Sequence, residues 1–249
     1  MNKRPIILTI AGHDPSGGAG LTSDVKTAEA LGCYGLSVCS GNTVQNDIEM
    51  TSCIWTDIDT MKAQISLLAN RLEINFIKIG VIENWSILNE MIDFILNINQ
   101  EAKIILDPVL KSSSEFSFQN QDHSDDLEKI LDKIYLLTPN YLEIEALFKD
   151  KSIPETIEFI SKKTNLLLKG GHNTEQVGMD KLFETNGDTI VYQSSVDKVY
   201  QKHGSGCVLS SAITSFLALN YSLDDSCERG KIYTERFLNS NESLLGYHG

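Results

Sequence analysis

The segment Gly204-Ser205-Gly206-Cys207 places two glycines and a thiol directly before a stretch with helical hydrophobic spacing. The first amides of a helix have no partner inside it, and the helix dipole adds partial positive charge there. Glycines let an anion approach those amides because they lack a Cβ. We therefore expect an anion hole at this helix N-terminus, with Cys207 at its edge. The alternative, a tight turn that caps a core helix, stays open on this segment alone.

Polar residues also follow several apolar runs that we expect to be buried strands, namely Asp107, Asn140 with Glu143, and Lys169. The carboxyl ends of parallel strands meet at one edge of a sheet, where ligands bind. Two carboxylates, a lysine and a helix N-terminus can together hold a phosphorylated ligand and a divalent cation. This combination predicts a site for an anionic substrate.

A second glycine-rich loop, residues 12–20, lies between an apolar run and an amphipathic stretch in which Asp24 stands near the start. The loop lacks the lysine of a phosphate-binding P-loop and the glycine spacing of a dinucleotide fingerprint. Asp24 is explained either by helix-start electrostatics or by ligand binding. We expect residues 41–47 to form a polar loop, in which the Gln45 amide either binds the edge of a heterocycle or caps its own backbone.

The elements that must position these residues alternate along the chain. The pattern predicts strands over 6–11, 36–40, 76–80, 104–106, 135–138 and 166–168, a hairpin of 179–183 with 189–192, and helices over 21–31, 58–72, 85–95, 141–148, 209–217 and 223–238. Such alternation is typical of an α/β fold with a mostly parallel sheet and helices on both faces. We find no composition shift that marks a linker, so we expect one domain over residues 1–249.

Composition excludes some partners. The 249 residues are 41% hydrophobic and carry a formal net charge of −13 at pH 7, which disfavours nucleic acid and anionic membrane. No apolar run approaches the length of a membrane span. The five cysteines include no Cys-x-x-Cys pair, which favours a reducing compartment over a disulfide framework or a zinc site. We therefore expect a cytoplasmic protein.

Taken together, the motifs resemble the hydroxymethylpyrimidine/phosphomethylpyrimidine kinases of thiamine biosynthesis. They occur in that family's order: 11–20, 24–27, 43–46, 107–109, 138–140 with Glu143, 169–172 and 203–207. The resemblance implies a ribokinase-like, three-layer α/β/α fold and the use of ATP and Mg²⁺. It also implies a homodimer and two successive phosphorylations of 4-amino-5-hydroxymethyl-2-methylpyrimidine, first to the monophosphate and then to the pyrophosphate.

The resemblance further implies roles for single residues. The pyrimidine would be bound by Gly12, Asp24, Gln45, Val81 and Val109, with Asp24 and Gln45 at the ring nitrogens and the exocyclic amine. ATP would be bound by Lys169, Asn140 and Gly206, and magnesium by Asp107 and Glu143. Gly204, Ser205 and Gly206 would form the anion hole around the transferring phosphoryl group. We expect Cys207 to be the base for the hydroxymethyl group, with its pKa lowered by the helix N-terminus.

The chain departs from the family pattern at a few positions. His13 stands where serine is usual, Val81 where methionine is common, and Ser205 where threonine is usual. Residues 111–114 lack the usual lysine-serine-glycine spacing, so we expect a different covering loop. Two alternatives stay open: a pyridoxal kinase of the same fold, and a pyrimidine sensor that binds without phosphoryl transfer.

Overall fold

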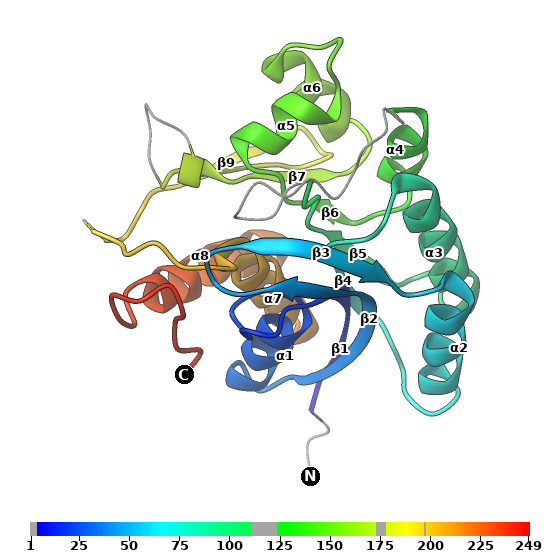
Figure 1. Cartoon of the computed structure of the whole chain (residues 1–249). Coiled ribbons are helices and arrows are strands. Elements are labelled where there is room, and N and C mark those ends of the chain that lie inside the picture. The colour runs from blue at the N-terminus through cyan, green and yellow to red at the C-terminus, as the bar shows by residue number, and fades with distance from the viewer. Residues whose placement is uncertain (1–3, 111–123, 173–177, 197) are drawn as a thin grey trace.

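The computed structural model describes residues 4–110, 124–172, 178–196 and 198–249. Within these ranges, one sheet of nine strands has the order β3-β2-β1-β4-β5-β6-β7-β8-β9 (Figure 1). Its strands are β1 (Ile6–His13), β2 (Tyr34–Gln45), β3 (Met50–Trp55), β4 (Phe76–Ile79), β5 (Lys103–Leu106), β6 (Leu136–Leu137), β7 (Asn165–Leu168), β8 (Asp180–Phe183) and β9 (Thr189–Tyr192). The six central strands, β2-β1-β4-β5-β6-β7, are parallel, and antiparallel strands flank them at both edges.

Helices cover both faces of this sheet (Figure 1). One layer consists of α1 (Gly20–Ala30), α7 (Ser205–Ala218) and α8 (Leu223–Leu238). The other consists of α2 (Ile58–Ala69), α3 (Trp85–Ile98), α4 (Ser124–Leu131), α5 (Tyr141–Leu147) and α6 (Ile153–Ser161). A short 3₁₀ helix, η1 (Gly170–His172), follows β7. The expected three-layer α/β/α fold is confirmed.

The central strands are buried on both faces, as their continuous apolar runs predict. On β5, Ile104 and Leu106 pack in the core beneath α2 to α6, whereas Ile105 packs in the core beneath α7 and α8. Alternation of side chains along each strand therefore divides the apolar residues between the two layers. The same geometry makes the strand ends, and the residues that follow them, converge at one edge.

The sequence prediction was wrong at one edge of the sheet. Residues 41–45, expected in a polar loop, continue β2, and β3 was not predicted at all. Both segments carry half-exposed and polar side chains, so they lack the apolar run that signals a buried strand. The hairpin of β8 with β9 and the last helix, α8, are confirmed. Residues 111–114, expected to form a covering loop, lie outside the described residues.

No helix in the described ranges has the length and apolar character needed to cross a membrane.

Candidate active site

The N-terminus of α7 is shaped by glycine. Gly204 is its N-cap, with φ of +77°, and a Cβ there would lie 2.1 Å from the carbonyl oxygen of Gly18. A side chain at position 204 would therefore meet both backbone strain and a clash. The first helical hydrogen bond runs from the Val208 amide to the Gly204 carbonyl, and no side chain of the described chain caps the helix. The preceding amides are therefore available to a ligand, as the anion-hole prediction requires.

A charged cluster lies against this helix end. The Lys169 Nζ atom is 2.7 Å from Asp107 Oδ1 and 3.6 Å from Glu143 Oε2. A Cβ on Gly206 would lie 3.4 Å from Lys169 Nζ and 3.7 Å from Asp107 Oδ2. The fold thus brings the ends of β5 and β7, the start of α5 and the N-terminus of α7 into one place. Four residues distant in the sequence form one polar cluster.

The cluster fixes the charges of its members. Burial alone would raise the pKa of Asp107, but the neighbouring ammonium groups of Lys169 and Lys78 hold it below its ordinary value. Burial disfavours the charge of Lys169, yet the carboxylates of Asp107 and Glu143 keep its pKa above the ordinary range. Burial raises the pKa of Glu143, against the effect of Lys169. A charged Asp107–Lys169 pair therefore stands next to the helix end.

The donor set at this cluster fits a magnesium ion. Mg²⁺ prefers carboxylate oxygens and keeps several water or phosphate ligands, so two protein carboxylates suffice. Asp107 and Glu143 would supply them, and both carboxylates now contact Lys169 Nζ. No group of three or more His, Cys, Asp or Glu side chains converges anywhere in the described ranges, this cluster included. Asn140 caps α5. Its side-chain Oδ1 accepts from the backbone amide of Glu143 at 2.9 Å, and its backbone amide donates to Glu143 Oε2 at 2.7 Å. This capping box orients Glu143 toward Lys169.

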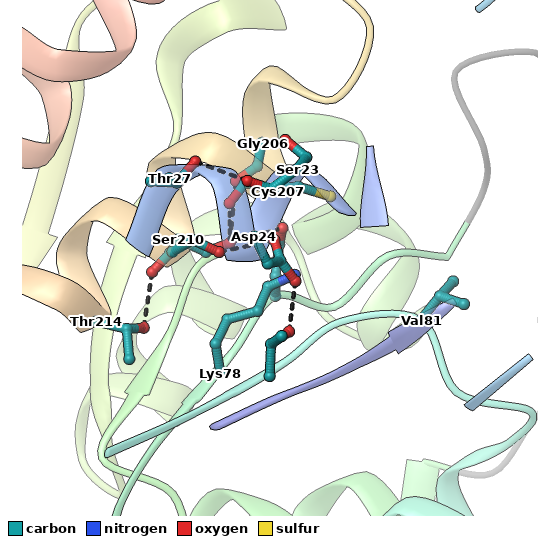
Figure 2. Close-up of polar contacts among 12 residues, drawn as sticks. Ser23, Asp24, Thr27, Lys78, Val81, Gly206, Cys207, Ser210 and Thr214 are labelled. Atoms are coloured by element: carbon teal, nitrogen blue, oxygen red, sulfur yellow. Dashed lines mark hydrogen bonds and ion pairs between the residues drawn. The ribbon is translucent and has the colours of Figure 1, made fainter. Parts of the chain in front are cut away.

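Cys207 lies at the N-terminus of α7, above a buried pair formed by Asp24 and Lys78 (Figure 2). Burial raises the pKa of its thiol to about 11. Lys78 and a hydrogen bond from the Gly20 amide act to lower that pKa, while Asp24 and Asp107 raise it. Our expectation of a lowered pKa is therefore wrong for this structure, because desolvation of the thiolate exceeds the favourable contributions.

Asp24 and Lys78 are both fully buried, and their side chains form an ion pair at 2.8 Å. Asp24 Oδ2 accepts from Lys78 and also from the Thr9 hydroxyl. Asp24 Oδ1 accepts from Ser211 Oγ at 2.7 Å. The predicted contact of Asp24 with the pyrimidine stays a prediction.

The remaining residues predicted for pyrimidine binding lie nearer the surface of the same sheet edge. A Cβ on Gly12 would lie 3.1 Å from Val81 Cγ1, so these two residues are in close contact. Val109 is half-buried, two residues after Asp107. Gln45 is half-buried at the end of β2. The predicted roles of Gly12, Val81, Val109 and Gln45 stay predictions.

Two residues of this region were missed in the sequence analysis. Asp14 is buried and accepts hydrogen bonds from His203 Nε2 at 2.9 Å, from the Ala19 amide at 2.9 Å and from the Gln45 side chain. It therefore connects the end of β2 with the residue before the anion hole. The second residue that was missed is Lys78, which is fully buried. The sequence feature that could have pointed to it is a single lysine within the apolar run of β4.

Known proteins are similar to this chain over most of its length. The sequence model of the phosphomethylpyrimidine kinase family matches residues 14–249. The chain is 30% identical to a hydroxymethylpyrimidine/phosphomethylpyrimidine kinase of Haemophilus influenzae, covering 98% of this chain and 94% of that protein. It is likewise 30% identical to the Escherichia coli protein of the same name, with 99% and 96% covered. It also matches a bifunctional thiamine biosynthesis protein of Methanocaldococcus jannaschii at 29% identity and spans 55% of that longer protein.

Solved structures give the same picture. The crystal structure of phosphomethylpyrimidine kinase from Clostridium difficile superposes with a TM-score of 0.78 at 31% identity, covering 93% of this chain and 98% of that one. Pyridoxal kinase from Staphylococcus aureus in complex with ADP has a TM-score of 0.83 at 19% identity, covering 99% and 92%, and shares the fold. Since the family match extends over nearly the whole length, the chain belongs to the phosphomethylpyrimidine kinase family.

Proposed function

We propose that this protein transfers the γ-phosphoryl group of ATP to 4-amino-5-hydroxymethyl-2-methylpyrimidine, and then to the resulting monophosphate, in thiamine biosynthesis. Family membership supports the reaction class. The observation that carries the proposal is the contact between the open N-terminus of α7, with its Cys207 thiol, and the Lys169–Asp107–Glu143 cluster. Phosphoryl transfer requires charge neutralisation, positioning and a group that takes the proton of the acceptor. Lys169 and the helix amides would supply the first two, and Cys207 the third.

In the first step, the ionised form of Cys207 takes the proton of the substrate hydroxyl. The hydroxyl oxygen then bonds to the γ-phosphorus, and the bond from that phosphorus to the bridging oxygen of ADP breaks. The amides of Ser205 and Gly206 bind the equatorial oxygens, where negative charge is held during transfer. Lys169 lies close to the same oxygens, because a Cβ on Gly206 would be 3.4 Å from Lys169 Nζ. The proton remains on the sulfur until solvent removes it.

Asp107 and Glu143 would hold magnesium, which when bound neutralises phosphate charge. The same residues also hold Lys169 in place, because its ammonium lies 2.7 Å from Asp107 Oδ1. Lys169 then faces the transferring group as a fixed positive charge. In the second step the acceptor is a phosphate oxygen that is already ionised, so no base is needed.

The proposal is tested by incubating the purified protein with ATP, Mg²⁺ and the hydroxymethylpyrimidine, and by measuring ADP release and the product masses. We expect the monophosphate to form first and the pyrophosphate later. A parallel reaction with pyridoxal tests the alternative substrate, and a higher kcat/KM for pyridoxal would overturn the proposal. Saturable binding of the pyrimidine without ADP release would instead identify a sensor.

We also propose that the protein forms a homodimer. The support is an apolar surface on the β2–β3 hairpin, defined by Val44 and Ile54, whose side chains are 56% and 69% exposed. The strand register places them as diagonal neighbours on one face. The cytoplasmic location stays a prediction.

A further inference from the structure

The peptide group that follows Lys169 is held by a buried carboxylate. The backbone pairing of β7 with β8 ends at Leu168, opposite Lys181. Beyond it, the Gly170 amide donates to Asp180 Oδ1 at 2.7 Å. On the opposite side, the Lys169 amide donates to the carbonyl oxygen of Pro139 at 2.9 Å. Both peptide groups that flank Lys169 are therefore anchored, one by backbone and the other by the side chain of Asp180.

Close packing of the backbone at Gly170 explains why a side chain is used here. A Cβ on Gly170 would lie 1.9 Å from the carbonyl oxygen of Met179, so this glycine packs directly on the chain that enters β8. The Gly178 amide donates to the Gly170 carbonyl oxygen at 3.2 Å. A hydrogen bond from an amide to a carboxylate is about twice as strong as one between neutral groups. The Asp180 contact is thus a strong anchor at the point where the backbone pairing stops.

Asp180 is held in turn by a buried network of charges. Lys231 on α8 places its Nζ atom 3.1 Å from Asp180 Oδ2, and the same ammonium donates to the Gly178 carbonyl oxygen. Glu235, one turn further along α8, lies 3.4 Å from that ammonium and accepts from the Ser195 amide. Each of the three charged side chains is less than a tenth exposed. Because apolar residues of similar volume often stabilise a fold equally well, stability alone explains such a network poorly.

The functional residue nearest to this network is Lys169. Its Nζ atom lies 2.7 Å from Asp107 Oδ1, and a Cβ on Gly206 would lie 3.4 Å from it. This ammonium ends a long side chain, so its location at the N-terminus of α7 depends on where the backbone of residue 169 is fixed. A displacement of about 1 Å in a reacting geometry can cost about 10²-fold in rate.

We propose that Asp180 is a positioning residue for phosphoryl transfer. Through the Gly170 amide it fixes the backbone from which Lys169 reaches the N-terminus of α7, and Lys231 and Glu235 hold Asp180 in place. The inference rests on the proposed function, in which Lys169 faces the transferring phosphoryl group. Because Lys169 serves both phosphorylations, loss of the Asp180 contact slows both steps alike.

The test compares two double variants that lack the same two charges. Asp180→Asn with Lys231→Met keeps an acceptor for the Gly170 amide, whereas Asp180→Leu with Lys231→Met removes the acceptor at similar volume. We expect kcat of both phosphorylations to be at least about thirtyfold lower with Asp180→Leu than with Asp180→Asn, while KM for the pyrimidine differs by less than about threefold. The difference between the two variants reports the acceptor alone.

Hydrogen exchange of the Gly170 amide, followed by NMR, measures the contact itself. Exchange should be at least about tenfold faster with Asp180→Leu than with Asp180→Asn. Equal exchange in the two variants would overturn the proposal. Faster exchange with equal kcat values would also overturn it, because Asp180 would then serve the fold alone. A loss confined to the first phosphorylation would do the same, because the effect would not pass through Lys169.

A matched control lies at the other end of the same strand. Asn165 Oδ1 accepts from the Thr185 amide at 3.1 Å, so it too holds a backbone amide across the β7–β8 pair. Asn165→Leu removes this hydrogen bond far from Lys169. It should leave kcat of both steps within about twofold of the wild type, since surface substitutions away from a site have small effects. A loss as large as that of the Asp180→Leu form would show that general loosening of β7 is the cause.

Two further measurements keep the outcome decisive. If Asp180→Leu with Lys231→Met does not fold, Asp180→Ala with Lys231→Met replaces it, and the same order of exchange and kcat decides. If the wild type releases no ADP, the proposed function fails, and the dissociation constant for the ATP analogue AMP-PNP with Mg²⁺ replaces kcat. Binding at least about fivefold weaker with Asp180→Leu than with Asp180→Asn would still support the positioning of Lys169, and equal binding would overturn it.

Discussion

At the scale of single residues, the proposed base is a thiol that is mostly protonated at neutral pH. Burial raises the pKa of Cys207 to about 11, so only a small fraction is ionised in the free protein. A base that is scarce in its active form limits only the step that consumes it. The two proposed phosphorylations differ in that respect, because only the first acceptor carries a proton that must be removed.

Cys207→Ala should therefore separate the two steps. We expect the first phosphorylation to fall by about 10²–10⁴ in kcat, the range usual for loss of a general base. The second should fall less than tenfold, since its acceptor is already ionised. The two rates are measured separately, with the hydroxymethylpyrimidine and with its monophosphate as substrates. Equal losses in both rates would show that Cys207 does not act as the base.

The raised pKa also predicts a pH dependence. The active form of Cys207 is the deprotonated one, so kcat/KM for the first step should rise with pH while most of the thiol is still protonated. The increase should approach tenfold per pH unit between pH 7.5 and 9.5, because kcat/KM reports ionisation of the free enzyme. The second step, measured over the same range, serves as the control and should change little. A plateau of the first step below pH 8 would contradict a pKa near 11.

At the scale of elements, α7 and the loop before α1 are held together by close backbone contact. Gly204 has φ of +77° and would place a Cβ 2.1 Å from the carbonyl oxygen of Gly18. His203, the preceding residue, bonds to Asp14 in the same loop at 2.9 Å. The proposed anion hole thus depends on two loops that lie in contact, and glycine permits that contact.

Gly204→Ala should destabilise the fold well beyond the cost of backbone strain. A left-handed conformation costs alanine about 1–2 kcal/mol, and the clash with Gly18 adds to it, so we expect a loss above about 3 kcal/mol. Gly32→Ala is the matched control, because Gly32 has φ of +82° and open space around its Cβ position. It should cost about 1 kcal/mol. Urea unfolding of both variants gives the comparison, and similar losses would mean that the contact with Gly18 relaxes easily.

The sequence was sufficient to predict elements with a strong apolar pattern. Helix α3 buries Leu88, Met91 and Ile95 at helical spacing, and the central strands are continuous apolar runs. Edge strand β3 escaped prediction because it is half-exposed and polar. The partners of Asp24 escaped it too, since Lys78 is 54 positions away in the chain and approaches only through the packing of α1 on the sheet. Motif spacing predicted which residues lie at the site, but burial decided their charge states.

At the scale of the whole molecule, the charge of −13 is compatible with the proposed site for anions because single ammonium groups and helix amides act locally at the strand ends. Lys78 and Lys169 both keep raised pKa values there, since neighbouring carboxylates outweigh the cost of burial. The acidic surface disfavours nonspecific polyanions, while backbone amides and two fixed ammonium groups act locally. Net charge therefore bears on the choice of partners and not on the chemistry of the site.

The apolar surface of Val44 and Ile54 gives the last prediction, on assembly. It lies on the β2–β3 hairpin beside edge strand β3, and unpaired edges with exposed apolar side chains favour association. We expect the wild type to be a dimer by light scattering at micromolar concentration, and Ile54→Glu to shift it to a monomer that keeps the circular dichroism spectrum of the wild type. Leu67→Glu is the control: this side chain is 72% exposed on α2, outside that surface, and its substitution should leave the dimer intact. A wild type that stays monomeric at high concentration would refute the homodimer, whereas a dimer that survives Ile54→Glu would place the interface on another face.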